Sequence, residues 1–204
     1  MKGPLVHRGE GVVPDELRTP RVLLRRWRPS DAVALQPVLA ANVEHLAPWI
    51  PWRVAEPLDV EPLAARLAEF AAAFDETREW RYGIFALADG AVLGEVSLFP
   101  RNSAGRVALD AADHLEIGYW VRADRTGEGL ATEAARAARD IAAAIAGISR
   151  ITIHCDERNA ASAAIPRRLG FQLAGVMGKE PSSPERRPTR VQTWEQQIDR
   201  SSGA

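Results

Sequence analysis

The hydrophobic positions of this chain follow two periods, and the two alternate along the sequence. Short apolar or β-branched runs predict strands, whereas apolar residues repeated every three or four positions predict amphipathic helices. The predicted strands span residues 21–27, 82–88, 91–99, 114–121, 150–155, 171–176 and 189–198. The predicted helices span residues 32–46, 60–74, 130–146 and 159–169. This mixture predicts a single-domain α/β (α+β) fold, with a mixed central sheet of about six to seven strands flanked by about four helices.

Turn and cap residues set the limits of several of these elements. A Pro-Ser-Asp turn that ends at Asp31 caps the first helix. Pro37 lies inside the same helix pattern and predicts a kink or a break there. The Asp89–Gly90 pair is a strong signal for a hairpin between two adjacent strands.

Segments without a hydrophobic period lie at the two ends of the chain and in two loops. Residues 1–18 predict an irregular N-terminal lead-in, and residues 200–204 predict a frayed C-terminus. Residues 45–52 (HLAPWIPW) predict a loop with two Trp and two Pro residues, and residues 178–188 predict a mobile loop. The domain itself therefore covers residues 19–199.

Charge, apolar content and cysteine usage exclude several classes of protein. The 26 Lys and Arg residues balance 27 Asp and Glu residues, and this net charge of −1 argues against a nucleic-acid-binding protein. The longest apolar run, near residues 142–148, is too short to span a bilayer, and no secretory signal is visible. We therefore expect a cytoplasmic protein without a membrane partner. Cys155 is the single cysteine and the four His residues lack ligand spacing, so neither a disulfide nor a metal site is expected.

The segment EIGYWVRADRTGEGLATEA, residues 116–134, predicts a strand, a glycine-containing turn and the start of a helix. The first turn of a helix carries unpaired N–H groups and the positive end of the helix dipole. Gly127 and Gly129 let a phosphate approach the backbone, and Thr126 and Thr132 add hydroxyl donors. A P-loop lysine and the third glycine of a dinucleotide fingerprint are both missing. Taken alone, this turn is equally well explained as a plain connection between strand and helix.

Four segments, taken in order, resemble the GNAT acyltransferases and, within them, the RimJ/RimL-like branch. They are TPRVLLRRWRPSDA with HLAPWIPW after it, YGIFALADGAVLGEVSL, EIGYWVRADRTGEGLATEA and NAASAAIPRRLGF. The resemblance covers residues 19–176, which is most of the chain. One position departs from the family pattern, because Asp124 stands where Gln or Arg is usual, between Arg122 and Arg125. Since the family's phosphate contacts are mainly to backbone N–H groups, we expect binding to survive this change.

The resemblance implies a GNAT fold with acetyl-CoA as co-substrate and a splayed V between the fourth and fifth predicted strands. The thioester is expected in this gap, where the backbone of Trp120 and Val121 pairs with the pantetheine arm as an added strand does. The pyrophosphate is expected on the loop and first helical turn that comprise Thr126, Gly127, Glu128, Gly129, Leu130, Ala131 and Thr132. The side chain of Glu128 is expected to point to solvent.

The resemblance also implies how the thiolate leaves. Asn159 and Ser162 form an Asn-x-x-Ser pattern at the start of a helix, and Ser162 is expected to protonate or hydrogen-bond the departing sulfur. The alternative is that both residues only cap that helix. Pro166 cannot donate a hydrogen bond to the carbonyl of residue 162, so this turn is expected to be irregular.

A base must accept a proton from the amine before or during attack. Glu116 is the first candidate, because the family often places a Glu that acts through water on this strand. The alternative is a surface carboxylate at a strand edge. Glu180, in the predicted mobile loop, is the second candidate, and His154 and His114 are the third.

The acceptor is the part of the reaction about which the residues say least. Trp49 and Trp52 are candidates for its binding site together with Glu180, although the two Trp residues could equally pack helices onto the sheet. The resemblance implies direct attack by a primary amine in a ternary complex, from either a protein or peptide N-terminus or a small molecule. The alternatives are a non-catalytic acyl-CoA-binding module, a transferase of a larger acyl group such as succinyl, and a nucleotide-binding domain. Many relatives dimerise, so a homodimer is a further expectation.

Overall fold

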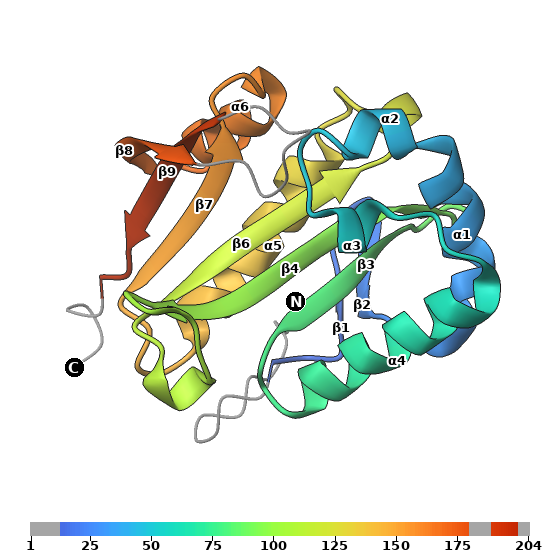
Figure 1. The fold of residues 1–204 in the computed structure, drawn as a ribbon. Helices are drawn as coiled ribbons and strands as arrows, with labels where there is room; N and C mark the ends of the chain where they lie inside the picture. Colours follow the sequence, from blue (N-terminus) through green and yellow to red (C-terminus); the bar gives the residue numbers. More distant parts are fainter. Residues whose placement is uncertain (1–12, 180–188, 200–204) are drawn as a thin grey trace.

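The apolar runs of the sequence pair into one sheet in the computed structural model, which describes residues 13–179 and 189–199 (Figure 1). The strands are β1 (Glu16–Arg18), β2 (Val22–Arg26), β3 (Trp80–Ala86), β4 (Val92–Asn102), β5 (Gly105–Arg106), β6 (His114–Val121), β7 (Arg150–Asp156), β8 (Gln172–Lys179) and β9 (Thr189–Gln197). The α-helices are α1 (Ala32–Ala41), α2 (Val43–Leu46), α3 (Trp52–Ala55), α4 (Val60–Asp75), α5 (Leu130–Ala144) and α6 (Ala160–Arg168). Short 3-10 turns form at η1 (Pro29–Asp31), η2 (Leu109–Ala111) and η3 (Ala123–Arg125).

The order of strands in the sheet is β1-β2-β3-β4-β6-β7-β9-β8, and β5 pairs with β4 beside this path. All of these pairs are antiparallel except β6 and β7, which run parallel. Two parallel neighbours need a crossover connection, and α5 supplies it. The predicted α/β class, mixed sheet and Asp89–Gly90 hairpin are therefore confirmed.

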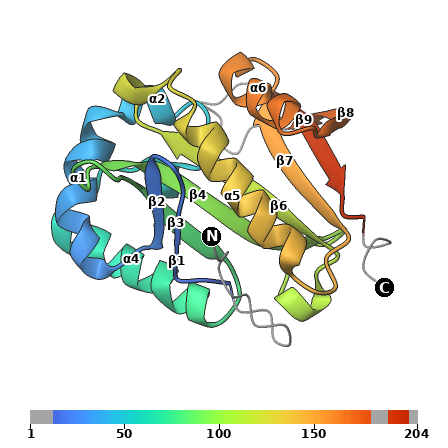
Figure 2. The same cartoon turned by 180° about the vertical axis from the view of Figure 1, so that it is seen from behind.

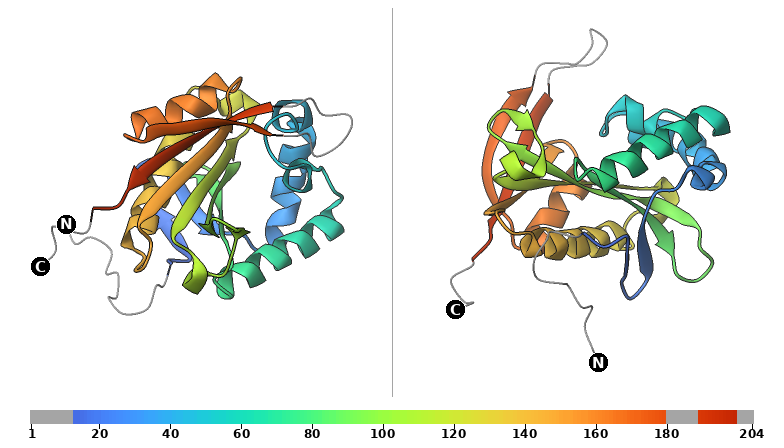
Figure 3. Two further views of the ribbon diagram at one scale, coloured as in Figure 1. Left: turned by 60° about the vertical axis from the view of Figure 1, so that its left-hand side comes forward. Right: turned by 90° about the horizontal axis from the view of Figure 1, so that it is seen from below.

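Helices cover the two faces of the sheet unequally. Helices α1 and α4 lie on one face, over the half of the sheet nearer the N-terminus (Figure 3). Helix α5 lies across the other face (Figure 2). Its buried side is mainly alanine, including Ala134, Ala135 and Ala138, so the helix backbone approaches the strands closely. This close packing fixes the start of α5 at the end of β6.

The sheet is larger than the predicted six to seven strands, because nine strands form among the described residues. The two extra strands, β1 and β5, have three and two residues, which is too short for a period-2 pattern to be visible. Strand β1 lies inside the segment 1–18 that was expected to be an irregular lead-in, so this expectation was wrong for residues 16–18. The predicted frayed end at residues 200–204 lies outside the described residues.

The first predicted helix does break, but at Asn42 rather than at Pro37. Helix α1 continues through Pro37, and a separate helix α2 begins after Asn42. The Asn42 side chain is buried, donates to the carbonyl of Val38 at 2.7 Å and accepts from the N–H of Ala123 at 2.7 Å. An amide that bonds to nearby and distant backbone competes with the helical ladder, which explains the break. The same bond ties the α1–α2 junction to the loop that follows β6.

Strands β6 and β7 part after a short paired stretch. Their register joins His114 to Arg150 and continues only as far as Ile117 and Ile153, although both strands run on. This parting is the V that was expected between the fourth and fifth predicted strands. Beyond it, the backbone of residues 118–121 is paired with β4 alone among the described strands.

Gly94 allows β4 to approach β6 at the open end of this V. A methyl group on Gly94 would collide with the carbonyl oxygen of Trp120 and lie 2.9 Å from the Cα of Val121. We expect Gly94→Ala to lower the free energy of unfolding by about 2–3 kcal/mol in urea, because both obstacles are backbone. Gly175→Ala is the matched control, since nothing lies within 4 Å of its added methyl. Equal stability of the two variants would contradict this packing.

Candidate active site

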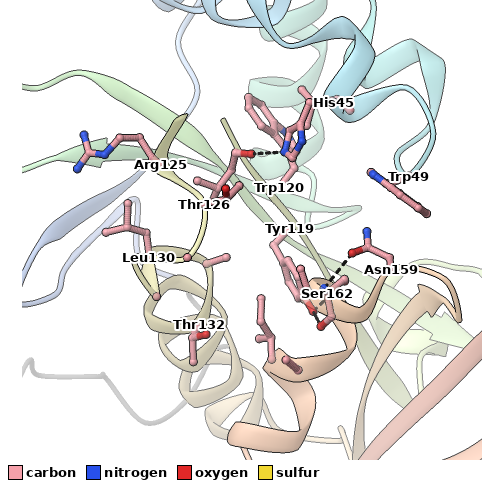
Figure 4. A pocket seen from close by; sticks show the side chains of 18 of the residues that line it. His45, Trp49, Tyr119, Trp120, Arg125, Thr126, Leu130, Thr132, Asn159 and Ser162 are labelled. Atoms are coloured by element: carbon pink, nitrogen blue, oxygen red, sulfur yellow. Dashed lines mark hydrogen bonds between the residues drawn. The ribbon is translucent and has the colours of Figure 1, made fainter. Parts of the chain in front are cut away.

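A cavity of about 270 Å³ lies where the end of β6, the start of α5, helix α6 and helix α2 come together (Figure 4). Most of the predicted site residues line it. These residues are Trp49, Trp120, Val121, Thr126, Gly127, Gly129, Leu130, Ala131, Thr132, Asn159 and Ser162. Glu116, Glu128 and Trp52 are not part of its wall, and Glu180 lies outside the described residues.

The loop before α5 presents a row of backbone N–H groups at this cavity. Gly127 and Gly129 have φ values of +81° and +79°, a region that glycine adopts without strain. Within the described part of the chain, no acceptor is recorded for the N–H groups of residues 127–132. The N–H of Glu133 is the first to bond within the helix, to the carbonyl of Gly129 at 3.0 Å. An unpaired row at a helix N-terminus is suited to an anion.

Two acidic side chains in this loop are each neutralised by a neighbouring arginine. Asp124 accepts from Arg122 at 2.6 Å, and Glu128 accepts from Arg125 at 2.7 Å. These bonds lower the pKa of both carboxyls, so both are ionised at neutral pH. Asp124 stands where the family usually has Gln or Arg. Because its charge is paired with Arg122, it adds no free negative charge to an anion site. The side chain of Glu128 points to Arg125 rather than into the cavity. The sequence analysis expected this side chain to point to solvent.

Helix α6 places Ser162 against Tyr119 of β6. The side chain of Asn159 accepts from the N–H of Ser162 at 3.0 Å, so Asn159 is the helix cap. The Ser162 hydroxyl takes no part in this cap and donates to the Tyr119 hydroxyl at 3.3 Å. The capping alternative therefore applies to Asn159, whereas the Ser162 hydroxyl lines the cavity with its proton directed at Tyr119.

Pro166 explains why Tyr119 is held at this point. Since proline has no N–H, the carbonyl of Ser162, four residues earlier, lacks its helical donor. The Tyr119 hydroxyl donates to that carbonyl at 3.0 Å. Burial raises the pKa of Tyr119, so its hydroxyl keeps its proton. Helix α6 runs through Pro166 with its bonding changed locally, which is the irregularity that the sequence predicts.

Glu116 lies outside the cavity, on the sheet face opposite α5. Its carboxylate pairs with the Nη2 of Arg101 at 2.6 Å. His154 shares this face, because its neighbours Ile153 and Cys155 on β7 point into the core that α5 covers. Burial lowers the pKa of His154, so its imidazole is neutral at pH 7, and its Nδ1 lies 3.1 Å from the Thr193 hydroxyl. These groups border the V on the side away from α5.

The other histidine candidate is engaged elsewhere, and the two Trp candidates differ. His114 pairs with Asp113 and is not part of the cavity wall. Trp49 lines the cavity and keeps 40% of its surface exposed. Trp52, at the start of α3, is 47% exposed outside the cavity. Neither Trp belongs to the buried core, which disfavours the alternative that they only pack helices onto the sheet.

Several cavity residues were missed by the sequence analysis. They are His45, Leu46, Ile50, Tyr119, Arg125, Ala161, Ala164, Ile165 and Arg168. His45 lies 3.2 Å through its Nε2 from the carbonyl of Val121, so this nitrogen must carry a proton. Pro166 signals a carbonyl without a donor, but not that Tyr119, 43 residues away from Ser162, supplies that donor. His45 had no signal, since its contact depends on how α2 crosses the end of β6.

Comparison with known proteins gives the family. The sequence of residues 21–172 matches the family described as "Acetyltransferase (GNAT) domain". The chain belongs to the GNAT acetyltransferase family. The predicted family is therefore confirmed, and with it the enzyme class, an acetyltransferase with acetyl-CoA as donor. The RimJ/RimL-like branch stays a prediction.

Two curated GNAT relatives come from Bacillus subtilis (strain 168). "Probable N-acetyltransferase YjcK" is 29% identical over 120 residues, which is 59% of this chain and 63% of that protein. "Putative ribosomal N-acetyltransferase YdaF" is 28% identical over 167 residues, covering 76% of this chain and 79% of that protein. Among solved structures, RimL, a ribosomal alpha-N-protein acetyltransferase in complex with coenzyme A, has a TM-score of 0.75 at 22% identity, covering 89% of this chain and 96% of that chain. This last likeness concerns the fold.

Across residues 13–179 and 189–199, no group of three His, Cys, Asp or Glu side chains is placed to hold a metal ion. In the same residues, no helix has both the length and the apolar character to cross a membrane.

We expect Gly129→Val to abolish acetyl-CoA binding in calorimetry. The φ value of +79° is strained for valine, and its side chain would stand next to the unpaired N–H row, with the Nη2 of Arg21 only 3.5 Å from the new Cβ. Gly90→Val is the matched control, because Gly90 has a similar φ of +74° in open space away from the cavity. If both variants bind acetyl-CoA as the wild type does, the loop is not the anion site.

Proposed function

We propose that this GNAT enzyme transfers acetyl from acetyl-CoA to the α-amine of a protein or peptide N-terminus, by direct attack in a ternary complex. The supporting observation is the cavity, which links the unpaired N–H row before α5 to the Ser162–Tyr119 pair. The diphosphate lies on residues 126–132, and the pantetheine arm pairs with the edge of Trp120 and Val121 that β7 leaves unpaired, where His45 contacts the Val121 carbonyl. The acetyl group then lies in the V. The proposal keeps the cytoplasmic location predicted from the sequence.

In this proposal, the amine nitrogen forms a bond to the thioester carbon, and the carbon–sulfur bond breaks. An acceptor that enters as an ammonium first loses one proton to solvent through a base. After attack the nitrogen loses a second proton and the departing thiolate gains one, which leaves an amide, a thiol and one proton in solvent. Ser162 lines the cavity, and its hydroxyl proton turns from the Tyr119 hydroxyl to donate a hydrogen bond to that sulfur. Tyr119 donates to the Ser162 carbonyl and so keeps the Ser162 hydroxyl within reach of the sulfur.

Glu116 is the base of this proposal and acts through water from the face opposite α5. An α-amine has a pKa near 8, so most acceptors carry a proton at neutral pH and need a base. The Glu116–Arg101 pair is close to neutral overall, which lowers the cost of a carboxylate at the edge of the V. His154 lies on the same face and is neutral. If Glu116→Gln stays active, His154 is the base instead of Glu116.

Two observations favour a peptide over a small amine as acceptor. Trp49 lines the cavity and is partly exposed, Trp52 three residues later is exposed as well, and exposed indoles suit an extended chain with apolar side chains. YdaF is named a putative ribosomal N-acetyltransferase, and the solved RimL structure is titled a ribosomal L7/L12 alpha-N-protein acetyltransferase. Which protein carries the acceptor N-terminus is left to the assay. A homodimer stays a prediction.

We expect the enzyme to acetylate peptides with a free N-terminus and to release one thiol per acetyl group. Mass spectrometry after incubation with acetyl-CoA locates the modification, and a thiol reagent gives the rate. The same peptides with a blocked N-terminus but a free lysine are expected to be inert. Glu116→Gln tests the base in the same assay, and its rate is expected to fall about a hundredfold.

Each alternative has its own result in this assay. Acetylation of polyamines or amino acids but of no peptide would replace the peptide proposal with a small-molecule acceptor. Faster transfer from succinyl-CoA than from acetyl-CoA would change the donor. Binding of acetyl-CoA without thiol release from any acceptor would leave a non-catalytic module.

We expect Ser162→Ala to reduce kcat about a hundredfold and to leave the Kd for acetyl-CoA within twofold. The reason is that the hydroxyl contacts the sulfur mainly as charge develops on it, whereas the diphosphate supplies most of the binding. Ser149→Ala is the matched control, because its hydroxyl bonds to the carbonyl of Asp113 far from the cavity. An unchanged kcat in Ser162→Ala would remove Ser162 from the mechanism.

A further inference from the structure

Arg21, just before β2, connects the N-terminal part of the chain to the loop before α5. Its Nη1 donates to the carbonyl of Glu128 at 2.8 Å. Its Nε and its backbone N–H donate to the two oxygens of Glu133 at 2.7 and 2.9 Å, and the Thr19 hydroxyl donates to Glu133 at 2.6 Å. The reaction as proposed above assigns no role to Thr19 or Arg21. Arg21 is also not part of the cavity wall.

The bond to Glu128 fixes the direction of one peptide group. In a trans peptide the C=O and the following N–H point in opposite directions, and no cis peptide occurs among the described residues. With the carbonyl of Glu128 held toward Arg21, the N–H of Gly129 points away from Arg21. Gly129, which borders this peptide, is conformationally free enough for the peptide to adopt another orientation. Arg21 therefore selects one of the orientations that Gly129 permits.

Arg21 also neutralises the third acidic side chain near this loop. Glu133 lies in the first turn of α5, and its side chain is only 15% exposed. Burial alone would raise the pKa of Glu133, but the bonds from Thr19 and Arg21 outweigh it and lower that pKa, so the group is ionised. An unpaired carboxylate here would compete with a bound anion for the helix N-terminus. Pairing with Arg21 removes this competition.

We propose that Arg21 is a positioning residue for the CoA diphosphate. Arg21 does not contact the diphosphate itself but orients the loop that binds it. It turns the N–H of Gly129 toward the anion and cancels the charge of Glu133. This inference rests on the proposed function, in which residues 126–132 hold the diphosphate. It gives the TPRVLLRRWRPSDA segment a role in binding the donor.

The test compares two acetyl donors, acetyl-CoA and S-acetylpantetheine, which lacks the diphosphate. We expect Arg21→Gln to raise the KM and the calorimetric Kd for acetyl-CoA about tenfold. With S-acetylpantetheine as donor, the kcat and the KM of Arg21→Gln are expected to stay within twofold of the wild-type values. Arg21→Lys is expected to recover only part of the affinity, because one ammonium cannot reproduce the fork that reaches Glu128 and Glu133. Arg78→Gln, which removes the exposed pair with Glu76, is the matched control.

The outcomes separate this inference from the function on which it rests. If wild-type protein does not bind acetyl-CoA, the proposed function fails. If the wild type binds and Arg21→Gln binds equally well, the positioning role fails. An equal rise in KM for both donors would show a general structural role instead, and full recovery in Arg21→Lys would show that charge alone suffices. Thermal unfolding of Arg21→Gln and Arg78→Gln shows that both variants are folded.

Discussion

The site depends on the point where β6 and β7 stop pairing. Their register ends at Ile117 and Ile153, and the strands then diverge. Because the two strands are parallel, their carboxyl ends lie at the same edge of the sheet, and α5 and α6 both begin there. The gap is therefore bordered by the edge of β6 that β7 leaves unpaired and by the N-termini of α5 and α6. A continuous ladder between β6 and β7 would close it and leave those helix ends without a shared ligand.

Near the gap, a backbone carbonyl without its helical donor and several carboxylates find partners in other parts of the chain. Pro166 removes one helical donor, and Tyr119 of β6 replaces it. Acidic side chains near the anion loop are paired with Arg122, Arg125 and Arg21. The row of N–H groups before α5 stays without a partner among the described residues, and a ligand anion can use it.

The order of elements and most of the cofactor side of the site could be predicted from the sequence, because both depend on local signals. Hydrophobic periods gave the long strands and helices, and the glycines before α5 marked the loop. Contacts between distant segments could not be predicted this way. The break at Asn42 depends on a bond to Ala123, and His45 enters the cavity through a bond to Val121. Such bonds depend on how helices cross strands, which no local window of sequence contains.

The position of β9 in the sheet has a consequence for folding during synthesis. Strand β9 lies between β7 and β8, although the ribosome makes β8 first. Until β9 emerges, the outer edge of β7 is unpaired, and β8 has no described neighbour in the sheet. An apolar strand with an open edge is a point of aggregation during translation. The nascent chain is therefore most in need of chaperone protection in the interval between the synthesis of β7 and that of β9.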